Sequence, residues 1–229
     1  MNKKEIASHR GYRQNKIHSN TLEAFKYAID INSDMIELDV RESKDNVLII
    51  FHDSKLYGKD IKKLNYDEIK SISNSRSFEI PTLKDTLQIV KDKIKLDIEL
   101  KEDKDEDKVV EEVLKYLDVD SFFISSFNLI SIMKIKKKYP YVKVGIIISK
   151  PKDLNENIIN NENIDVFVLH YKLMKKVEKL KFIKDRGKKI YLWTVNNIKK
   201  IRDYLKNEYI DGIITDRPDK ALKIRDGSE

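Results

Sequence analysis

The sequence predicts an α/β fold, a (β/α)8 barrel with a small hairpin and loop insertion after the second strand. Eight short apolar runs, rich in Ile, Val and Leu, alternate with amphipathic segments of helical period along the chain. Repeated strand–helix units build a parallel sheet, and eight of them close naturally into a barrel. Such barrels usually need roughly 250 residues, so a short version fits residues 1–229 as a single domain.

The N-terminal half contains the hairpin insertion. Asn20 or Thr21 is placed to cap the first helix. A polar turn, Lys44-Asp45-Asn46, separates the second strand from its hairpin partner. The elements expected here are a strand at 6–8, a helix at 21–31, a strand at 35–40, a hairpin strand at 47–51, a short helix around 65–72 and a helix beginning at Pro81-Thr82.

Strands and helices alternate regularly in the C-terminal half. The expected strands are 94–100, 122–125, 142–148, 164–169, 188–194 and 212–215, and the helices are 105–116, 129–138, 153–160, 174–186, 198–207 and 218–225. A doubly wound open sheet is the alternative. The first strand is not followed by a Gly-rich dinucleotide turn, and the chain has no Walker loop, which favours the barrel.

Composition excludes several classes of function. The 46 Lys and Arg residues exceed the 39 Asp and Glu residues, which gives a net charge of +7. The lysines are mixed with acids along the expected helices and are not interleaved with stacking aromatic residues, so we expect no nucleic-acid partner. The chain has no cysteine, which excludes disulfides, thiolate catalysis and zinc–thiolate sites.

The sequence predicts a soluble, cytoplasmic protein. Its first six residues, Met-Asn-Lys-Lys-Glu-Ile, run directly into a strand without the apolar region of a signal peptide. No apolar run approaches the ~18 residues of a membrane span, so we expect no stable membrane insertion. The pattern does not specify an oligomeric state.

Unusual polar residues collect where the expected strands end. In a barrel of this kind the carboxyl ends of the strands form the active site, whereas randomly placed charges would not favour one end of so many strands. In strand order these residues are His9 and Arg10, Glu37 and Asp39, Glu99 and Lys101, Ser125 and Ser126, His170, Trp193 and Thr194, and Thr215 and Asp216.

The acids among them indicate a metal site. Glu37 and Asp39 are separated by one residue, so both carboxylates leave the same face of a strand. Together with Glu99 they can place three oxygen ligands around one divalent cation, either Mg²⁺ or Ca²⁺. Without a cation, two acids on one face of a strand repel each other and make a poor core.

The basic residues complete a site for metal-assisted transfer at phosphorus. Arg10 and Lys101 can neutralise phosphate oxygens, and Arg10 can do so in a bidentate way. His52 arrives at the end of the hairpin strand. It can divide the acid and base roles with His9, since imidazole titrates near working pH.

Each residue also has a structural interpretation. A lone strand-end acid is more often a solvated residue or a cap than a metal ligand, and His52-Asp53 can be a simple turn with a hydrogen-bonded histidine. Lys101 opens a charged run, 101–108, that suits a solvated face. Trp193 can belong to the core, and His170 is best read as structural. The combined pattern favours a site because the structural interpretation must explain every position separately.

An ordered set of motifs resembles the glycerophosphodiester phosphodiesterase family, whose fold is a TIM barrel. The resemblance covers residues 6–222, and the complete set is far more specific than any one motif. The matching segments are Ser-His-Arg-Gly at 8–11, Asn-Thr-Leu-Glu-Ala-Phe at 20–25, Asp-Met-Ile-Glu-Leu-Asp-Val at 34–40, Lys-Asp-Asn at 44–46, Phe-His-Asp at 51–53, Ile-Pro-Thr-Leu at 80–83, Leu-Asp-Ile-Glu-Leu-Lys at 96–101, Ser-Ser-Phe at 125–127, Trp-Thr-Val-Asn at 193–196 and Asp-Gly-Ile-Ile-Thr-Asp-Arg-Pro at 211–218.

The resemblance implies a short bacterial-type enzyme that hydrolyses small-molecule glycerophosphodiesters to glycerol 3-phosphate and an alcohol. In the family mechanism the neighbouring glycerol hydroxyl attacks phosphorus, and water then opens the cyclic phosphate. The implied roles are catalytic for His9 and His52, substrate-binding for Arg10, Lys101 and Trp193, and metal-binding for Glu37, Asp39 and Glu99.

One departure from the family pattern lies before the first helix. Family members usually have Pro-Glu-Asn-Thr, whereas this chain has His18-Ser19-Asn20-Thr21. Ser19 therefore removes an acid near the metal and histidine cluster, and His18 adds a titratable group. We expect reduced rather than absent activity, because the presumed ligands and both histidines remain.

Two other functions compete with this interpretation. A lysophospholipase D would use the same site on a single-chain lipid, and residues 56–78 would then carry an exposed apolar patch or an amphipathic anchor. That segment is mostly Lys, Asp, Asn and Ser, which favours a water-soluble substrate. The loss of the acid at Ser19 also suggests the alternative of a barrel that binds phosphodiesters without turnover.

Overall fold

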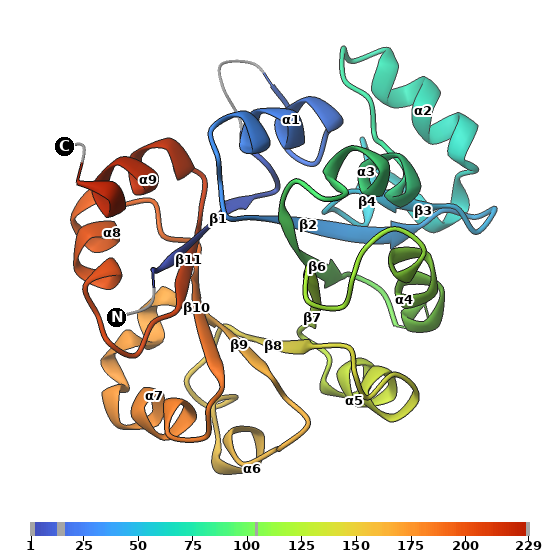
Figure 1. Ribbon diagram of the computed structural model, residues 1–229. Helices are drawn as coiled ribbons and strands as arrows, with labels where there is room; N and C mark the ends of the chain where they lie inside the picture. Colours follow the sequence, from blue (N-terminus) through green and yellow to red (C-terminus); the bar gives the residue numbers. More distant parts are fainter. Residues whose placement is uncertain (1–2, 13–16, 104, 228–229) are drawn as a thin grey trace.

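The computed structural model describes residues 3–12, 17–103 and 105–227, and it confirms the predicted barrel (Figure 1). Adjacent barrel strands pair in parallel, and β1 pairs with both β2 and β11, which closes the sheet. The open-sheet alternative is therefore wrong. The eight strands are β1 (Glu5–His9), β2 (Met35–Glu42), β6 (Lys95–Leu100), β7 (Phe122–Ser126), β8 (Val144–Ile148), β9 (Val166–His170), β10 (Lys189–Trp193) and β11 (Gly212–Thr215).

Helices surround the barrel and pack their apolar faces on its outer surface (Figure 1). They are α1 (Leu22–Asp30), α3 (Leu83–Val90), α4 (Glu106–Leu114), α5 (Leu129–Lys138), α6 (Glu156–Ile159), α7 (Val177–Lys184), α8 (Ile198–Leu205) and α9 (Pro218–Asp226). In the described ranges, none of the helices has the length and apolar character that a membrane span requires.

Three helices differ from expectation by more than small shifts at their ends, or in how they begin. Helix α3 begins two residues after Pro81, because Thr82 and Asp85 form a reciprocal capping box. The helix expected at 153–160 is only the single turn α6. The one expected at 174–186 is divided into the 3-10 turn η2 (Tyr171–Lys175) and α7, because Lys176 between them has non-helical backbone angles, φ −99° and ψ 53°.

The insertion after β2 is larger than the sequence predicts. The expected hairpin strand is β3 (Leu48–Ile50), antiparallel to β2. An unexpected second hairpin follows, formed by β4 (Lys55–Leu56) and β5 (Lys59–Asp60), and then η1 (Ile61–Lys63). The next element, α2 (Tyr66–Asn74), is the short helix expected around 65–72. These elements bury an apolar cluster of their own, which makes the insertion a stable support for the loop between β3 and β4.

The inside of the barrel is layered. Because successive strand residues face opposite sides of the sheet, alternate residues point inward. An apolar layer fills the middle, and at the amino-terminal end Lys95 and Tyr191 contact Glu5. These side chains close the amino-terminal end of the barrel interior, and the polar layer lies at the carboxyl-terminal end. The middle layer contains Ala7, Met35, Phe123, Ile147, Val166, Val168, Tyr191 and Ile214.

Candidate active site

Three buried carboxylates meet inside the barrel. Glu37 and Asp39 lie on β2 and Glu99 lies on β6, and one carboxylate oxygen from each lies within 4.8 Å of the others. The strand register explains the cluster, because Asp39 is paired directly with Glu99. Sequence reasoning placed Glu37 and Asp39 at a strand end, but pairing with β3 extends β2 to Glu42, so both are mid-strand on the inner face.

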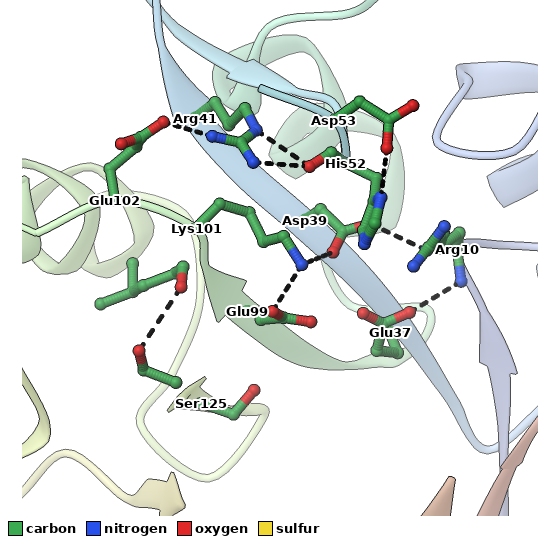
Figure 2. Close-up of polar contacts among 12 residues, drawn as sticks. Arg10, Glu37, Asp39, Arg41, His52, Asp53, Glu99, Lys101, Glu102 and Ser125 are labelled. Atoms are coloured by element: carbon green, nitrogen blue, oxygen red, sulfur yellow. Dashed lines mark hydrogen bonds and ion pairs between the residues drawn. The ribbon is translucent and has the colours of Figure 1, made fainter. Parts of the chain in front are cut away.

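Two cations contact this carboxylate cluster (Figure 2). Lys101 Nζ lies 2.6 Å from Glu99 Oε1 and 3.2 Å from Asp39 Oδ1. Arg10 contributes its backbone N–H to Glu37 Oε2 at 2.9 Å and its Nε lies 3.0 Å from Asp39 Oδ2. The structure thus places the two predicted phosphate-binding cations beside the predicted metal ligands.

The chain must turn sharply after β1 to aim Arg10 in this way. Arg10 has φ 57° and Gly11 has φ 79°, so both adopt left-handed backbone conformations. A Cβ on Gly11 would lie 2.8 Å from the backbone carbon of Ala24, which leaves room only for glycine. In the Ser-His-Arg-Gly segment the backbone geometry therefore requires glycine at position 11. The two residues before it, His9 and Arg10, carry the functional groups.

Burial makes the carboxylate cluster electrostatically strained. It raises the pKa of Glu37 well above its ordinary value, and repulsion from Asp39 and Glu99 adds to the rise. Burial and repulsion from Asp39 raise the pKa of Glu99 to about 7. Burial also opposes ionisation of Asp39, but Lys101 and Arg10 outweigh it and lower the pKa. Three close acids with too little compensating charge suit a divalent cation.

His9 is held by a chain of hydrogen bonds from the other end of the sequence. Its Nδ1 lies 2.7 Å from Asp216 Oδ1, just after β11. Asn196 Nδ2 donates to Asp216 Oδ2 at 2.6 Å, and the backbone N–H of Asp216 donates back to Asn196 Oδ1 at 2.9 Å. On the other side of the ring, Nε2 lies 3.9 Å from Glu37 Oε2. One imidazole nitrogen is therefore fixed, while the other faces the carboxylate cluster.

His52 has a similar arrangement. Its Nδ1 lies 2.7 Å from Asp53 Oδ1 (Figure 2). Burial lowers the pKa of His52, although the Asp39 and Asp53 carboxylates oppose this effect. A histidine with a lowered pKa is neutral near pH 7 and is able to accept a proton.

A pocket of about 110 Å³ joins these groups. Its lining includes both histidines, both cations, Glu37 and Glu99, together with the aromatic side chains of Trp193 and Phe127. Trp193 is held by a bond from Nε1 to the Val168 carbonyl at 3.1 Å, and its ring meets Phe127 and His170 edge-on. His170 thus supports Trp193, in agreement with its structural interpretation.

The loop before α1 reaches the same site. Asn20 Nδ2 donates to Asp39 Oδ2 at 2.7 Å, and Thr21 caps α1, so of the two residues proposed as the cap Thr21 takes that role. Ser19, which departs from the family pattern, directly precedes Asn20. His18 is stacked on Phe78 at 4.3 Å and lines a larger groove of about 840 Å³ between α1 and the insertion. That groove contains none of the predicted catalytic residues.

Sequence reasoning missed Asp97 as a member of the pocket. Asp97 is 1% exposed, and Ser125 Oγ donates to its Oδ1 at 2.6 Å. Its Oδ2 is buried without a hydrogen-bond partner in the described residues, and burial raises the pKa of Asp97 to about 8. Its position two residues before Glu99 on the same strand was the available signal.

The roles of two further residues also escaped notice. The sequence showed Asp216 and Asn196 within conspicuous segments, but it did not show that they form a support for His9. That contact joins residues 207 positions apart, and it exists because β1 and β11 are neighbours in the closed barrel.

Comparisons with known proteins bear on the family of the chain. The model of the "Glycerophosphoryl diester phosphodiesterase family" matches residues 9–220. A glycerophosphodiester phosphodiesterase of Bacillus altitudinis is 30% identical, over 97% of this chain and 98% of the relative. One from Caldanaerobacter subterraneus is 29% identical, over 96% of each chain. The crystal structure of a Thermotoga maritima glycerophosphodiester phosphodiesterase is 30% identical, with TM-score 0.82, covering 96% of this chain and 97% of that chain.

Proposed function

Because this chain belongs to the glycerophosphoryl diester phosphodiesterase family and is an enzyme of that class, we propose that it hydrolyses water-soluble glycerophosphodiesters to glycerol 3-phosphate and an alcohol. One observation carries the proposal. Glu37 and Glu99 of the carboxylate cluster line one pocket at the carboxyl-terminal end of the barrel, together with two histidines that are each held by a neighbouring carboxylate.

The carboxylate cluster of Glu37, Asp39 and Glu99 would hold one divalent cation, Mg²⁺ or Ca²⁺. Hard oxygen ligands suit these ions. Burial, and after it repulsion between the carboxylates, raises the pKa values of Glu37 and Glu99, and a cation would offset both effects. When bound, the cation supplies Lewis-acid polarisation of a phosphoryl oxygen.

Arg10 and Lys101 would bind the phosphoryl oxygens of the substrate. Both are held beside the carboxylate cluster, with side chains 24% and 11% exposed, so their positive charges are poorly screened by solvent. Planar Arg10 is suited to two parallel hydrogen bonds to phosphate, whereas Lys101 acts as a point charge. Trp193 and Phe127 would pack on the glycerol or the head group.

His9 and His52 would carry the protons through a cyclic phosphate. One histidine takes the proton of the glycerol hydroxyl next to the phosphoester as that oxygen bonds to phosphorus. The other gives a proton to the head-group oxygen as its bond to phosphorus breaks. In the second step water attacks the cyclic phosphate, and the two proton transfers run in reverse. The carboxylate contacts at Nδ1 leave Nε2 of each ring for the reaction.

The structure favours this substrate class over a single-chain lipid. Within residues 56–78, Tyr57 is the only large apolar side chain that is strongly exposed, and Arg76 lies over its ring at 4.3 Å. A contiguous apolar surface for a lipid is therefore not formed by this segment. The non-catalytic alternative is also disfavoured, because both histidines retain orienting partners despite the change at Ser19.

A direct assay tests the proposed reaction. Purified wild type should release glycerol 3-phosphate from glycerophosphocholine or glycerophosphoethanolamine, and His9→Ala and His52→Ala should each be slower by about 100-fold or more. ³¹P NMR during turnover should detect the cyclic phosphate. Binding of these compounds by calorimetry, without any product from wild type, would instead support a binding barrel.

A further inference from the structure

Arg41 is a buried cation that none of the steps above uses. It lies on β2 two residues after Asp39 and is 8% exposed. Its guanidinium donates two hydrogen bonds to the backbone carbonyl of His52, from Nε at 2.9 Å and from Nη2 at 2.7 Å (Figure 2). On the basis of the proposed function, we propose that Arg41 is a positioning residue that fixes the loop carrying His52.

The loop needs such a support because the sheet ends just before it. Pairing between β2 and β3 runs only to Val40 and Ile50. One more backbone bond follows, from the N–H of Phe51 to the Asp39 carbonyl at 2.9 Å. His52 comes next, and the Arg41 guanidinium binds its carbonyl in place of a strand partner. Charge-assisted hydrogen bonds of this kind are stronger than neutral ones.

The remaining nitrogen of the guanidinium connects this loop to a second functional loop. Arg41 Nη1 is paired with Glu102 Oε1, and Glu102 Oε2 lies 2.7 Å from Lys62 Nζ on η1. Glu102 directly follows Lys101. The contacts of one side chain therefore join the loop with His52 to Glu102, the residue that follows Lys101.

This arrangement requires arginine rather than any cation. A buried charge is costly unless it is paired and hydrogen-bonded, and here a carbonyl and a carboxylate take all three guanidinium nitrogens. Lysine has a compact ammonium without the planar fork, so it can retain only part of this geometry.

The expected consequence concerns the chemical step. Proton transfer demands precise placement, and a displacement of about 1 Å can cost on the order of 100-fold in rate. Substrate binding should change little, because Arg10 and Lys101 keep their own contacts. A loosened His52 loop should thus lower kcat while KM stays nearly constant.

Arg225 provides a matched control. Its side chain is 7% exposed, and it too donates to a backbone carbonyl, that of Lys4 at 3.2 Å, and pairs with Asp34. These partners flank the amino-terminal ends of β1 and β2, opposite the site. Arg225→Gln should lower the melting temperature as Arg41→Gln does, and it should keep kcat within about 3-fold of wild type.

The test compares wild type, Arg41→Gln, Arg41→Lys and Arg225→Gln with glycerophosphocholine. Arg41→Gln should lose about 10- to 100-fold in kcat, with KM within about 3-fold, and Arg41→Lys should recover part of the loss. Equal kcat for Arg41→Gln and Arg225→Gln would overturn the proposal. So would a rise in KM that accounts for the whole effect of Arg41→Gln.

A second readout does not depend on turnover. The chain has four histidines, so the imidazole ¹⁵N signals of His52 can be assigned with His52→Ala. Arg41→Gln should shift or broaden those signals, and Arg225→Gln should leave them unchanged. An unaltered His52 spectrum in Arg41→Gln would overturn the positioning role. A wild type without turnover would count against the proposed function, and this spectrum would still decide the role of Arg41.

Discussion

Glu99 is the residue at which we expect the proposed function to lower stability. It is buried beside Asp39, and its raised pKa records the cost of ionising it there. At about pH 8, Glu99→Gln should raise the free energy of unfolding of the metal-free protein by about 1–2 kcal/mol. It should also weaken divalent-cation binding by more than about 10-fold. Chemical denaturation and calorimetry check the two effects.

Glu106→Gln is the matched control for that substitution. Glu106 is 4% exposed on α4, where it pairs with Lys134 at 3.3 Å on the outside of the barrel. Its loss should lower stability slightly and leave cation binding unchanged. If Glu99→Gln destabilised the metal-free protein as Glu106→Gln does, the repulsion inferred within the carboxylate cluster would be wrong.

Asp216 should matter to the reaction through His9. Asp216→Asn keeps the size of the side chain, but it removes the charge that holds Nδ1. We expect kcat to fall about 10- to 100-fold, with a smaller change in KM. Asp211→Asn is the control, because Asp211 also accepts several hydrogen bonds but lies before β11, at the other end of the barrel. Similar kcat values for both variants would contradict the positioning role.

At the scale of elements, the turn between β1 and α1 connects stability with catalysis. Gly11→Ala would place a Cβ 2.8 Å from the backbone of Ala24 and would strain a left-handed backbone. It should therefore displace Arg10, destabilise the protein by about 1–3 kcal/mol and lower activity. Gly58→Ala has a similar φ, 85°, but its Cβ meets nothing within 4 Å. It should cost less stability and keep activity, as melting curves and steady-state rates will show.

Elements differ in how far the sequence predicts them. The eight strands follow from Val-, Ile- and Leu-rich runs, because the neighbouring helices and the barrel interior bury both faces of each strand. The Glu37, Asp39 and Glu99 cluster follows from the period of two along β2 and β6. The β4–β5 hairpin was missed because each strand has only two residues, with Tyr57-Gly58 as the sole turn signal.

Contacts that depend on the tertiary structure could not be predicted in this way. Arg41 binds a backbone carbonyl, a group that every residue carries, so no sequence pattern marks it as the partner. The division between η2 and α7 depends on the backbone of Lys176. The support of His9 by Asp216 could have been inferred only after assuming that the first and last strands pair.

At the scale of the whole molecule, the site should make stability depend on pH in an unusual direction. The pKa of Glu99 is raised to about 7 and that of Asp97 to about 8, so the folded protein binds these protons more tightly than the unfolded chain does. Their stabilising contribution is complete at low pH and is lost as pH rises through these values. The melting temperature of metal-free protein should fall by several degrees between about pH 6.5 and 9. The lowered pKa of His52 affects stability below this pH range.

A divalent cation should reverse that trend. Its carboxylate ligands must be deprotonated, so binding strengthens as pH rises. A cation at about 100 times its Kd adds about 2.7 kcal/mol of stability. At one fixed cation concentration the gain should be larger at pH 9 than at pH 6.5, because Kd is lower at pH 9. Thermal melts with Mg²⁺, Ca²⁺ and chelator measure it. A melting temperature of metal-free protein that rises across this range would show that the buried acids are not protonated in the folded state.

The most direct test is cation-dependent turnover. Chelator-treated wild type and Glu37→Ala would be supplied with Mg²⁺ or Ca²⁺ while glycerol 3-phosphate release from glycerophosphocholine is followed. We expect wild type to be inactive with chelator and to recover in a saturable way with one of the cations, while Glu37→Ala stays at least about 100-fold slower at every concentration. Full activity of wild type in chelator, or equal rates for the two proteins, would contradict a cation-dependent phosphodiesterase site at Glu37, Asp39 and Glu99.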